Sequence, residues 1–149
     1  MEKREDLPLY LFHQGTNYHA QDYLGAHREG EEWVLRVFAP RADAVFAVGE
    51  FNAWQECDPL VRISAGGVFE GRVRAPEGAL YKFKIYSGGR VLYKADPYAF
   101  AAGRPPETAS RLCTRAGYEW RDGGWMRYRA RFAGRRDLPM NVYEMHLGS

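Results

Sequence analysis

The chain has 149 residues, of which 46% are hydrophobic, 15% aromatic and 27% charged. This length holds one ordinary domain, or a domain of about 100 residues with flanking segments, but not a complete (β/α)8-barrel enzyme of about 250 residues. The 21 Lys and Arg residues exceed the 19 Asp and Glu residues by only two, so the charge alone does not indicate a nucleic-acid partner. No segment reaches the run of about 20 apolar residues that spans a bilayer.

The first 29 residues are polar and aromatic, with turn signals at Gly15 and Asn17. The first twelve residues carry charges before a short apolar patch but lack the sustained apolar core and cleavage site of a secretory signal. We therefore expect residues 1–29 to be an N-terminal extension that packs on the following domain. We also expect a cytoplasmic protein without a membrane partner.

Short β-like runs, separated by Gly, Pro and Asn, follow the extension. Residues 33–39 are β-branched and aromatic up to Pro40, and residues 44–48 are nearly all apolar, which is typical of a buried strand. In residues 68–74 and 81–85 apolar and charged side chains alternate, and residues 87–90 predict a hairpin turn into a strand at 91–95. This pattern predicts an all-β fold, an antiparallel immunoglobulin-like β-sandwich over residues 30–115 with N- and C-terminal extensions.

The region after the predicted sandwich is basic and rich in turns. Arg127, Arg129 and Arg131 are interleaved with Tyr128 and Phe132. Arginines that alternate with aromatic residues can contact phosphates and stack on bases. An edge strand or linker with a solvated face is the commoner meaning of such a run, and the near-neutral charge of the chain favours it. We therefore expect no nucleic-acid partner.

One tryptophan stands on a polar loop. Trp54 closes the segment GEFNAW at residues 49–54 and is followed by polar residues. The flat face of a glucose ring packs on an aromatic face, and its hydroxyl edge needs donors and acceptors nearby. Lys82 and Lys84, on the solvent side of their strand, are candidate donors, and Tyr93 on the paired strand is a candidate second ring. From composition alone the favoured interpretation is structural, because most loop tryptophans are: Trp54 caps the core and the lysines keep the sheet face hydrated.

The sequence offers no cofactor site. His13, His19 and His27 lack the spacing of metal ligands, and no pair of cysteines accompanies them, so we expect no metal. Neither Cys57 nor Cys113 stands beside an activating residue, which argues against a thiol nucleophile. The two cysteines could form one disulfide, but nothing in the sequence requires it.

Three segments, taken with their order and spacing, resemble one family. They are residues 49–54 (GEFNAW), 81–85 (YKFKI) and 94–100 (KADPYAF). They resemble the amino-terminal module of bacterial glycogen branching enzymes. That module belongs to carbohydrate-binding module family 48, a β-sandwich also found in debranching enzymes and in the β subunit of AMP-activated kinase. The resemblance extends to residues 22–27, 104–111 and 141–149, and so covers nearly the whole chain.

The resemblance implies a fragment of a larger enzyme. Residues 141–149 (NVYEMHLGS) resemble the first barrel strand of the glycoside hydrolase family 13 catalytic domain. This implies a linker over residues 116–137 and only the start of the catalytic barrel over 138–149. The family's catalytic aspartate and glutamate lie on later barrel strands and form a covalent glycosyl-enzyme intermediate. No residue of this chain corresponds to them, so we expect this fragment to be inactive, whereas its parent would make α-1,6 branches from α-1,4-glucan.

The resemblance also implies a set of binding residues. Trp54 matches the tryptophan of the family's Phe-Asn-x-Trp turn, and Lys82 matches the lysine of its Tyr-Lys-Phe strand. Tyr93 stands where kinase-type members carry a second sugar-stacking tryptophan. Residues 104–111 do not match the Gly-Thr-x-Asn-like stretch that completes the site in those members.

Several functions remain open at this point. The first hypothesis is a module that binds α-1,4-glucan, such as glycogen or malto-oligosaccharides, and positions it for the catalytic barrel of its own enzyme. The second is a structural or interaction sandwich with little independent sugar binding. The third is the same module from a debranching enzyme.

Overall fold

The computed structural model describes residues 6–115, 119–135, 137–139 and 141–146. The chain divides into two compact units, Met1–Arg115 and Ala116–Ser149, and each is described by itself. The predicted sandwich lies in the first unit. The second unit carries a short helix, α2 (Gly123–Ala130).

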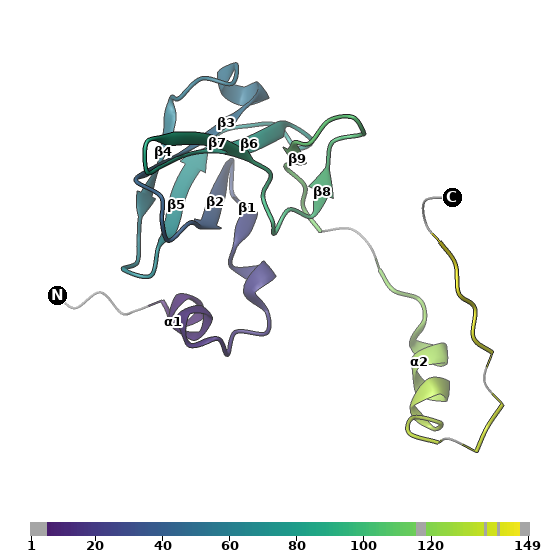
Figure 1. The fold of residues 1–149 in the computed structure, drawn as a ribbon. Coiled ribbons are helices and arrows are strands. Elements are labelled where there is room, and N and C mark those ends of the chain that lie inside the picture. Colours follow the sequence, from purple (N-terminus) through teal and green to yellow (C-terminus); the bar gives the residue numbers. More distant parts are fainter. Residues whose placement is uncertain (1–5, 116–118, 136, 140, 147–149) are drawn as a thin grey trace. The chain divides into compact units, whose positions relative to one another are not determined.

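The first unit is built mainly from antiparallel strands (Figure 1). A short helix, α1 (Leu7–Gln14), precedes the strands. One short 3₁₀ helix, η1 (Ala20–Asp22), lies before β1, and another, η2 (Glu50–Asn52), lies between β3 and β4. The strands are β1 (Gly25–Glu29), β2 (Glu32–Phe38), β3 (Ala44–Gly49), β4 (Asp58–Arg62), β5 (Val68–Val73), β6 (Leu80–Ser87), β7 (Arg90–Lys94), β8 (Ala101–Ala102) and β9 (Ser110–Arg111).

The strands form two layers joined through one strand. Their order is β1-β2-β5-β4-β3-β6-β9-β8, and β7 pairs with β6. Strand β4 pairs with β5 on one side and with β3 on the other, so it links the β1-β2-β5 layer to the β3-β6 layer. The predicted all-β antiparallel sandwich is therefore confirmed (Figure 1).

Alternate side chains of the strands fill the space between the layers. Trp33 and Leu35 of β2 meet Val45 of β3 and Tyr81 and Phe83 of β6 in one hydrophobic core. All five are almost completely buried, and each large apolar side chain removed from water contributes about 1.5–3 kcal/mol. Side chains alternate between the two faces of a strand. Because Tyr81 and Phe83 point into the core, Lys82 and Lys84 lie on the outer face of β6.

The two outer faces of the sandwich differ in chemistry. On the β2-β5 side, ion pairs join Arg36 to Glu70 at 2.7 Å and Arg72 to Glu29 at 2.8 Å. On the β3-β6-β7 side, aromatic rings accompany the charged groups, and Tyr86 packs edge to face on Phe46 with a centroid distance of 6.0 Å. The second face carries the rings of Tyr86 and Phe46 beside its charged groups.

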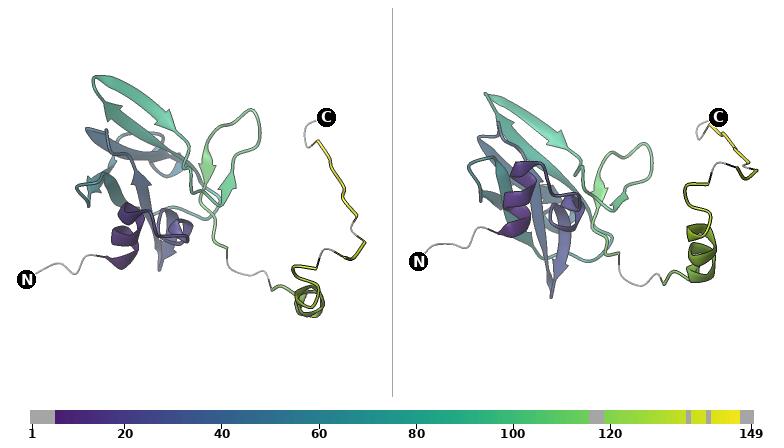
Figure 2. Two further views of the ribbon diagram at one scale, coloured as in Figure 1. Left: turned by 60° about the horizontal axis from the view of Figure 1, so that its bottom comes forward. Right: turned by 90° about the horizontal axis from the view of Figure 1, so that it is seen from below.

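The N-terminal segment covers part of the first layer. Leu9 and Phe12 of α1 pack on a small cluster with Tyr23, Leu24 and Val68, and Figure 2 shows α1 beside the strands of this layer. The first strand, β1, begins at Gly25 and pairs with β2. The sheet therefore starts five residues before the boundary that the sequence places at residue 30.

The second unit differs from the sequence prediction in its secondary structure. The edge strand considered for the run from Arg127 to Phe132 is wrong, because α2 covers residues 123–130. Trp125 and Tyr128 are three residues apart on one face of α2, and Phe132 follows in the turn after the helix. Their rings contact one another, with centroid distances of 5.8 and 4.7 Å. Residues 141–146 have no regular secondary structure, and residues 147–149 of the predicted barrel strand lie outside the described residues.

Neither helix in the described part of the chain is long and apolar enough to cross a membrane. Cys57 and Cys113 are both free thiols, so the disulfide that the sequence left open is not formed.

Candidate functional site

The turn after β3 is held by a network of side-chain to backbone hydrogen bonds. Asn52 Oδ1 accepts a hydrogen bond from the Gly49 N–H at 2.9 Å, and Asn52 Nδ2 donates to the Ala47 carbonyl at 2.9 Å. Asn52 Nδ2 also donates to Asp58 Oδ2 at 2.6 Å, which ties the turn to β4. Glu50 Oε2 accepts a hydrogen bond from the Leu80 N–H at 2.8 Å, which ties it to β6. The turn is therefore fixed to three strands.

The end of this turn adopts an unusual backbone conformation. Ala53 and Trp54 have φ angles of 51° and 62°, in the left-handed region that costs a residue with a side chain about 1–2 kcal/mol. The Trp54 N–H donates to the Gly49 carbonyl at 2.9 Å, which closes the turn. Trp54 is 40% exposed. The hydrogen bonds of the turn offset the cost of a conformation that presents a half-exposed tryptophan at the surface.

Trp54 lines a cavity of about 320 Å³ with residues from β6 and from the loop before β9. Lys82 is one of them, and its Nζ donates a hydrogen bond of 2.8 Å to Thr108 Oγ1. The remaining lining residues are Leu80, Pro106, Glu107 and Ala109. One aromatic ring is thus combined with an ammonium group, a hydroxyl and a carboxylate. This is the combination that a sugar needs, since a sugar has an apolar ring face and a hydroxyl edge.

Tyr93 lies on the same face but outside the lining of this cavity. It stands opposite Lys84 in the pairing of β7 with β6, and the Lys84 Nζ is 5.3 Å from the centre of its ring. Lys82 and Lys84 are two residues apart on β6, so Lys82 and Tyr93 face the same side of the sheet. The Tyr93 side chain is 52% exposed. The structure therefore brings Trp54 and Lys82 into one cavity and places Tyr93 farther along the same face.

Glu107 and Thr108 were not among the residues predicted for the site. They lie in the loop between β8 and β9, where the sequence does not match the family's Gly-Thr-x-Asn-like stretch. Thr108 is 26 residues from Lys82, and no periodicity or motif in the sequence connects the two. Only the β8-β9 hairpin, which returns the chain to β6, brings them together.

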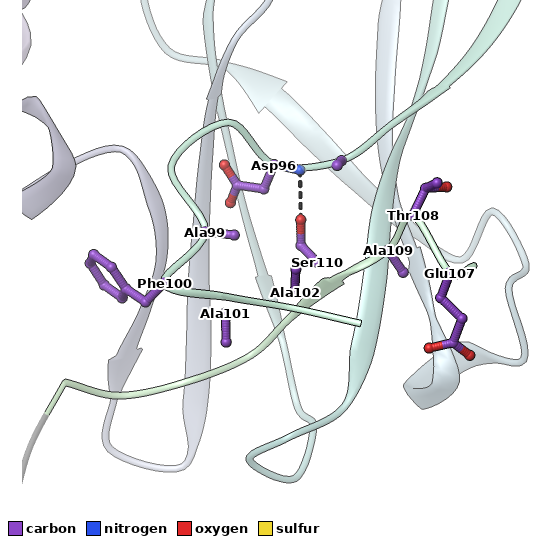
Figure 3. Close-up of a pocket in the computed structure, with 10 residues that line it drawn as sticks. Asp96, Ala99, Phe100, Ala101, Ala102, Glu107, Thr108, Ala109 and Ser110 are labelled. Carbon is purple, nitrogen blue, oxygen red and sulfur yellow. Dashed lines mark hydrogen bonds between the residues drawn. The ribbon is translucent and has the colours of Figure 1, made fainter. Parts of the chain in front are cut away.

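A second cavity, of about 370 Å³, lies beside the β8-β9 hairpin (Figure 3). Its polar centre is Asp96, which is only 6% exposed. The Tyr81 hydroxyl donates to Asp96 Oδ2 at 2.5 Å, the Tyr98 N–H donates to Oδ1 at 2.8 Å, and the Asp96 N–H donates to Ser110 Oγ at 2.8 Å. Burial raises the pKa of the Asp96 carboxyl group, and it also raises the pKa of the Tyr81 hydroxyl.

This second cavity is a poorer candidate for a ligand site than the first. Both oxygens of the Asp96 carboxylate already accept hydrogen bonds from the chain itself. Much of the rest of the lining is alanine, whose side chain offers no polar group, and one aromatic ring, Phe100 (Figure 3). The two cavities share Glu107, Thr108 and Ala109, so the same loop borders both. We therefore take the Trp54 cavity as the candidate site.

Within the described residues, no group of three or more His, Cys, Asp or Glu side chains is arranged to hold a metal ion.

Comparison with known sequences identifies the family. The profile described as carbohydrate-binding module 48 (isoamylase N-terminal domain) matches residues 23–99, which is more than half of the chain. This range runs from the residues just before β1 to the residues just after β7. It includes Trp54, Lys82 and Tyr93 but ends before Glu107 and Thr108.

Branching enzymes are similar to the chain along nearly its whole length. The 1,4-alpha-glucan branching enzyme GlgB of Bacillus caldolyticus is 43% identical over 155 residues, which cover 97% of this chain and 22% of that protein. The enzyme of the same name from Jannaschia sp. (strain CCS1) is 40% identical over 146 residues, which cover 97% of this chain and 20% of that protein. The chain thus spans about a fifth of the length of these relatives.

Solved structures share the fold. A pullulanase from Anoxybacillus sp. LM18-11, in complex with maltotetraose, superposes with a TM-score of 0.54 at 23% identity, over 62% of this chain and 14% of that one. A putative alpha amylase from Salmonella typhimurium superposes with a TM-score of 0.55 at 20% identity, over 69% of this chain and 17% of that one. The family match and the sandwich fold agree, and the chain belongs to carbohydrate-binding module family 48.

Proposed function

We propose that this chain binds α-1,4-glucan, as glycogen or malto-oligosaccharide, at the cavity formed by Trp54 and Lys82. We further propose that it serves as the N-terminal glucan-binding and positioning module of a 1,4-alpha-glucan branching enzyme in glycogen biosynthesis. Relatives of that name match 97% of the chain at 40–43% identity, which supports the second part. The chemistry of branching would reside in the catalytic barrel of that enzyme, which would be the second partner of the module.

The observation that carries the proposal is the arrangement around Trp54. Its indole is held at the surface by a turn with two left-handed residues, and it faces a cavity that also contains Lys82, Glu107 and Thr108. The ring would stack on the apolar face of a glucose unit. The ammonium, carboxylate and hydroxyl groups would donate to and accept from its hydroxyl edge. Tyr93, farther along the same face, would stack on another unit of the glucan.

Titration calorimetry with maltoheptaose tests this proposal. We expect saturable binding by the native chain and at least about tenfold weaker binding by Trp54→Ala, which corresponds to ~1.4 kcal/mol, since truncation of an aromatic anchor costs this much or more. Trp125→Ala is the matched control, because Trp125 is also exposed and does not line the cavity. Equal affinities of the native chain and Trp54→Ala would remove Trp54 from the site.

A structural role with little sugar binding is the second candidate. It is favoured by the bond between Lys82 and Thr108, which uses one of the three protons of the ammonium group within the chain. In that case millimolar maltoheptaose would leave the amide chemical shifts of the first unit unchanged. A parallel measurement of retention on DNA separates both candidates from a nucleic-acid binder. A nucleic-acid binder would be retained, and its retention would weaken as the salt concentration rises.

We also propose that the protein works in the cytoplasm. Both cysteines are free in the structure. Free thiols are the usual state in the reducing cytosol, where disulfides are rare. Labelling of Cys57 with a thiol reagent in intact, then lysed, cells tests this directly, because Cys57 is exposed.

A further inference from the structure

The second unit exposes an aromatic surface that the proposed glucan site does not use. No residue of α2 is buried. Trp125 is 61% exposed and Tyr128 is 54% exposed, and their rings stack with a centroid distance of 5.8 Å. The Phe132 ring, in the turn after the helix, lies 4.7 Å from that of Tyr128. We call these three residues the α2 face.

The α2 face borders an open cavity of about 730 Å³, which is about twice the volume of either cavity of the first unit. The other lining residues belong to the end of the helix and to the segment that follows it, and they are Arg129, Ala133, Gly134, Leu138 and Pro139. All of them lie within the second unit. A continuous exposed surface of aromatic and aliphatic side chains is typical of an interaction site.

The helix α2 is too short to be stable by itself. An isolated helix of eight residues is marginal in water, because the entropy lost in its first turn is not offset over so short a length. It begins with Gly123 and Gly124, which are poor helix formers, and the side chain of Asp122 forms no capping hydrogen bond. Helices of this kind are stabilised by burial of an apolar face. We therefore expect a partner to cover the α2 face.

The comparisons with known proteins indicate where that partner lies. The carbohydrate-binding module profile ends at residue 99, so α2 lies outside it. The branching-enzyme relatives match 97% of the chain, which includes α2. The matched residues make up only 20–22% of those relatives. The region that contains α2 is therefore shared with proteins in which a much larger part lies beyond the match.

Arginine side chains surround the α2 face. Residues 119–135 contain five arginines and two acidic residues. Arg127, Arg129 and Arg131 are exposed, and Arg129 also lines the cavity. Arg135 forms an ion pair with Asp137 at 2.5 Å. A surface that complements this one combines an apolar pocket for the rings with carboxylates at its rim.

We propose that the α2 face docks on the catalytic barrel of the enzyme, in an apolar pocket with an acidic rim. This inference rests on the proposed function, which makes the barrel a partner of this chain. Trp125 is the anchor that enters the pocket, Tyr128 and Phe132 pack around it, and Arg129 pairs with a carboxylate of the rim. In this arrangement α2 is a docking element within the linker that the sequence predicts over residues 116–137.

Hydrogen exchange of the α2 amides, followed by mass spectrometry, tests the proposal without any substitution. The 149-residue chain is compared with the intact enzyme, in which the chain is continued by its catalytic barrel. We expect the α2 amides to exchange at least about tenfold more slowly in the intact enzyme, because the docked helix must detach before it opens. Fast exchange in both proteins would show that α2 is part of a flexible linker. Equally slow exchange in both would show that α2 needs no partner. Either result would overturn the proposal.

Two substitutions in the intact enzyme locate the contact. We expect Trp125→Ala and Arg129→Glu each to raise the exchange rate of the α2 amides at least about threefold. Tyr18→Ala is the matched control, because Tyr18 is an aromatic residue of the first unit that is 87% exposed, and we expect it to leave the rate unchanged. An unchanged rate in Trp125→Ala would remove the anchor and overturn the proposal. An unchanged rate in Arg129→Glu alone would overturn the acidic rim.

Maltoheptaose separates this inference from the proposed function. We expect the ligand at millimolar concentration to leave α2 exchange in the 149-residue chain unchanged, because the Trp54 cavity lies in the first unit. Slower α2 exchange with the ligand would make the α2 face a sugar site and overturn the docking role. Glucan binding at Trp54 together with an unprotected α2 in the intact enzyme would overturn this inference alone. A protected α2 without glucan binding would overturn the glucan site alone.

Discussion

The Nζ of Lys82 donates a hydrogen bond of 2.8 Å to the Oγ1 of Thr108, and this bond joins β6 to the loop before β9 at the wall of the Trp54 cavity. The bond orients an ammonium group whose remaining two protons are available to a ligand. It also links a residue that the family resemblance identifies to one that it does not. The proposed glucan site is therefore shared between a strand that carries the family motif and a loop that departs from the kinase-type pattern.

The first prediction concerns this bond. Lys82→Met retains the length of the side chain and removes its charge and donors, so we expect maltoheptaose binding to weaken about tenfold, the effect of a lost charged hydrogen bond of ~1.5 kcal/mol. Calorimetry measures the affinity. Thr108→Val, which is nearly isosteric, and the double variant complete a thermodynamic cycle. Strictly additive effects of the two substitutions on binding would show that the bond contributes nothing to the site.

The second prediction concerns the turn that presents Trp54. A Cβ atom at Gly49 would lie 2.4 Å from the Leu80 carbonyl oxygen and 2.6 Å from the Phe51 ring. The clash with backbone arises although the φ of Gly49, −174°, suits any residue. We expect Gly49→Ala to lower the free energy of unfolding by about 1–3 kcal/mol, the cost of overpacking a close contact. Urea denaturation measures this change.

Gly124→Ala is the control for that substitution. Gly124 lies in α2 with open space around a Cβ atom, and alanine is the better helix former. We therefore expect no loss of stability from Gly124→Ala. If Gly49→Ala unfolds at the same urea concentration as the native chain, the close packing of the turn against β6 is not as described.

The third prediction concerns the buried carboxyl group of Asp96. Burial raises its pKa in the folded state above that of the unfolded chain, near 3.9. The contribution of this group to the free energy of unfolding is fully present below the unfolded-state pKa, where both states are protonated. It is lost as the pH rises through the folded-state pKa, because the unfolded state releases the proton first. We expect the free energy of unfolding of the native chain, relative to Asp96→Asn, to decrease as the pH is raised from about 4 to 7.

Thermal unfolding over this pH range provides the test, because the amide of Asp96→Asn does not titrate. Its oxygen can still accept one hydrogen bond, and its NH2 can donate to the Tyr81 oxygen, since a tyrosine hydroxyl both donates and accepts. A difference between the two proteins that stays constant with pH would show that the pKa of Asp96 is the same in both states.

Much of the fold could be predicted because burial on one face leaves a period of two in the sequence. Tyr81, Phe83 and Ile85 alternate with Lys82 and Lys84, and the structure places the first three toward the core and the lysines outward. The apolar run at 44–48 likewise became the central strand β3, which pairs with β4 and β6. In both cases the local pattern and the tertiary structure agree.

The elements that the sequence did not reveal depend on partners rather than on local pattern. Strands β8 and β9 are two residues each, and they exist because Ser110 and Arg111 pair with both β8 and β6. No two-residue segment carries a periodicity. The helix α2 was missed because its alternation of arginine and aromatic residues resembles an exposed strand. Only the spacing of Trp125, Tyr128 and Phe132 fits a helix.

The residues of the candidate site likewise include some that the sequence predicts and some that it does not. The family motif supplied Trp54, Lys82 and Tyr93 as candidates, and the structure brings Trp54 and Lys82 into one cavity. Glu107 and Thr108 could not be predicted, since their place beside Trp54 depends on the return of the β8-β9 hairpin to β6.

The proposal that α-glucan binds at Trp54 can be tested with the indole N–H signals of the four tryptophans. Trp33 is the internal reference, because it is buried in the core with its Nε1 bonded to the Ala75 carbonyl at 3.1 Å. On titration with maltoheptaose, we predict that the Trp54 indole signal in the ¹⁵N-labelled chain shifts and saturates while the Trp33 signal stays in place. A folded chain in which the Trp54 signal does not move at millimolar maltoheptaose would contradict the account.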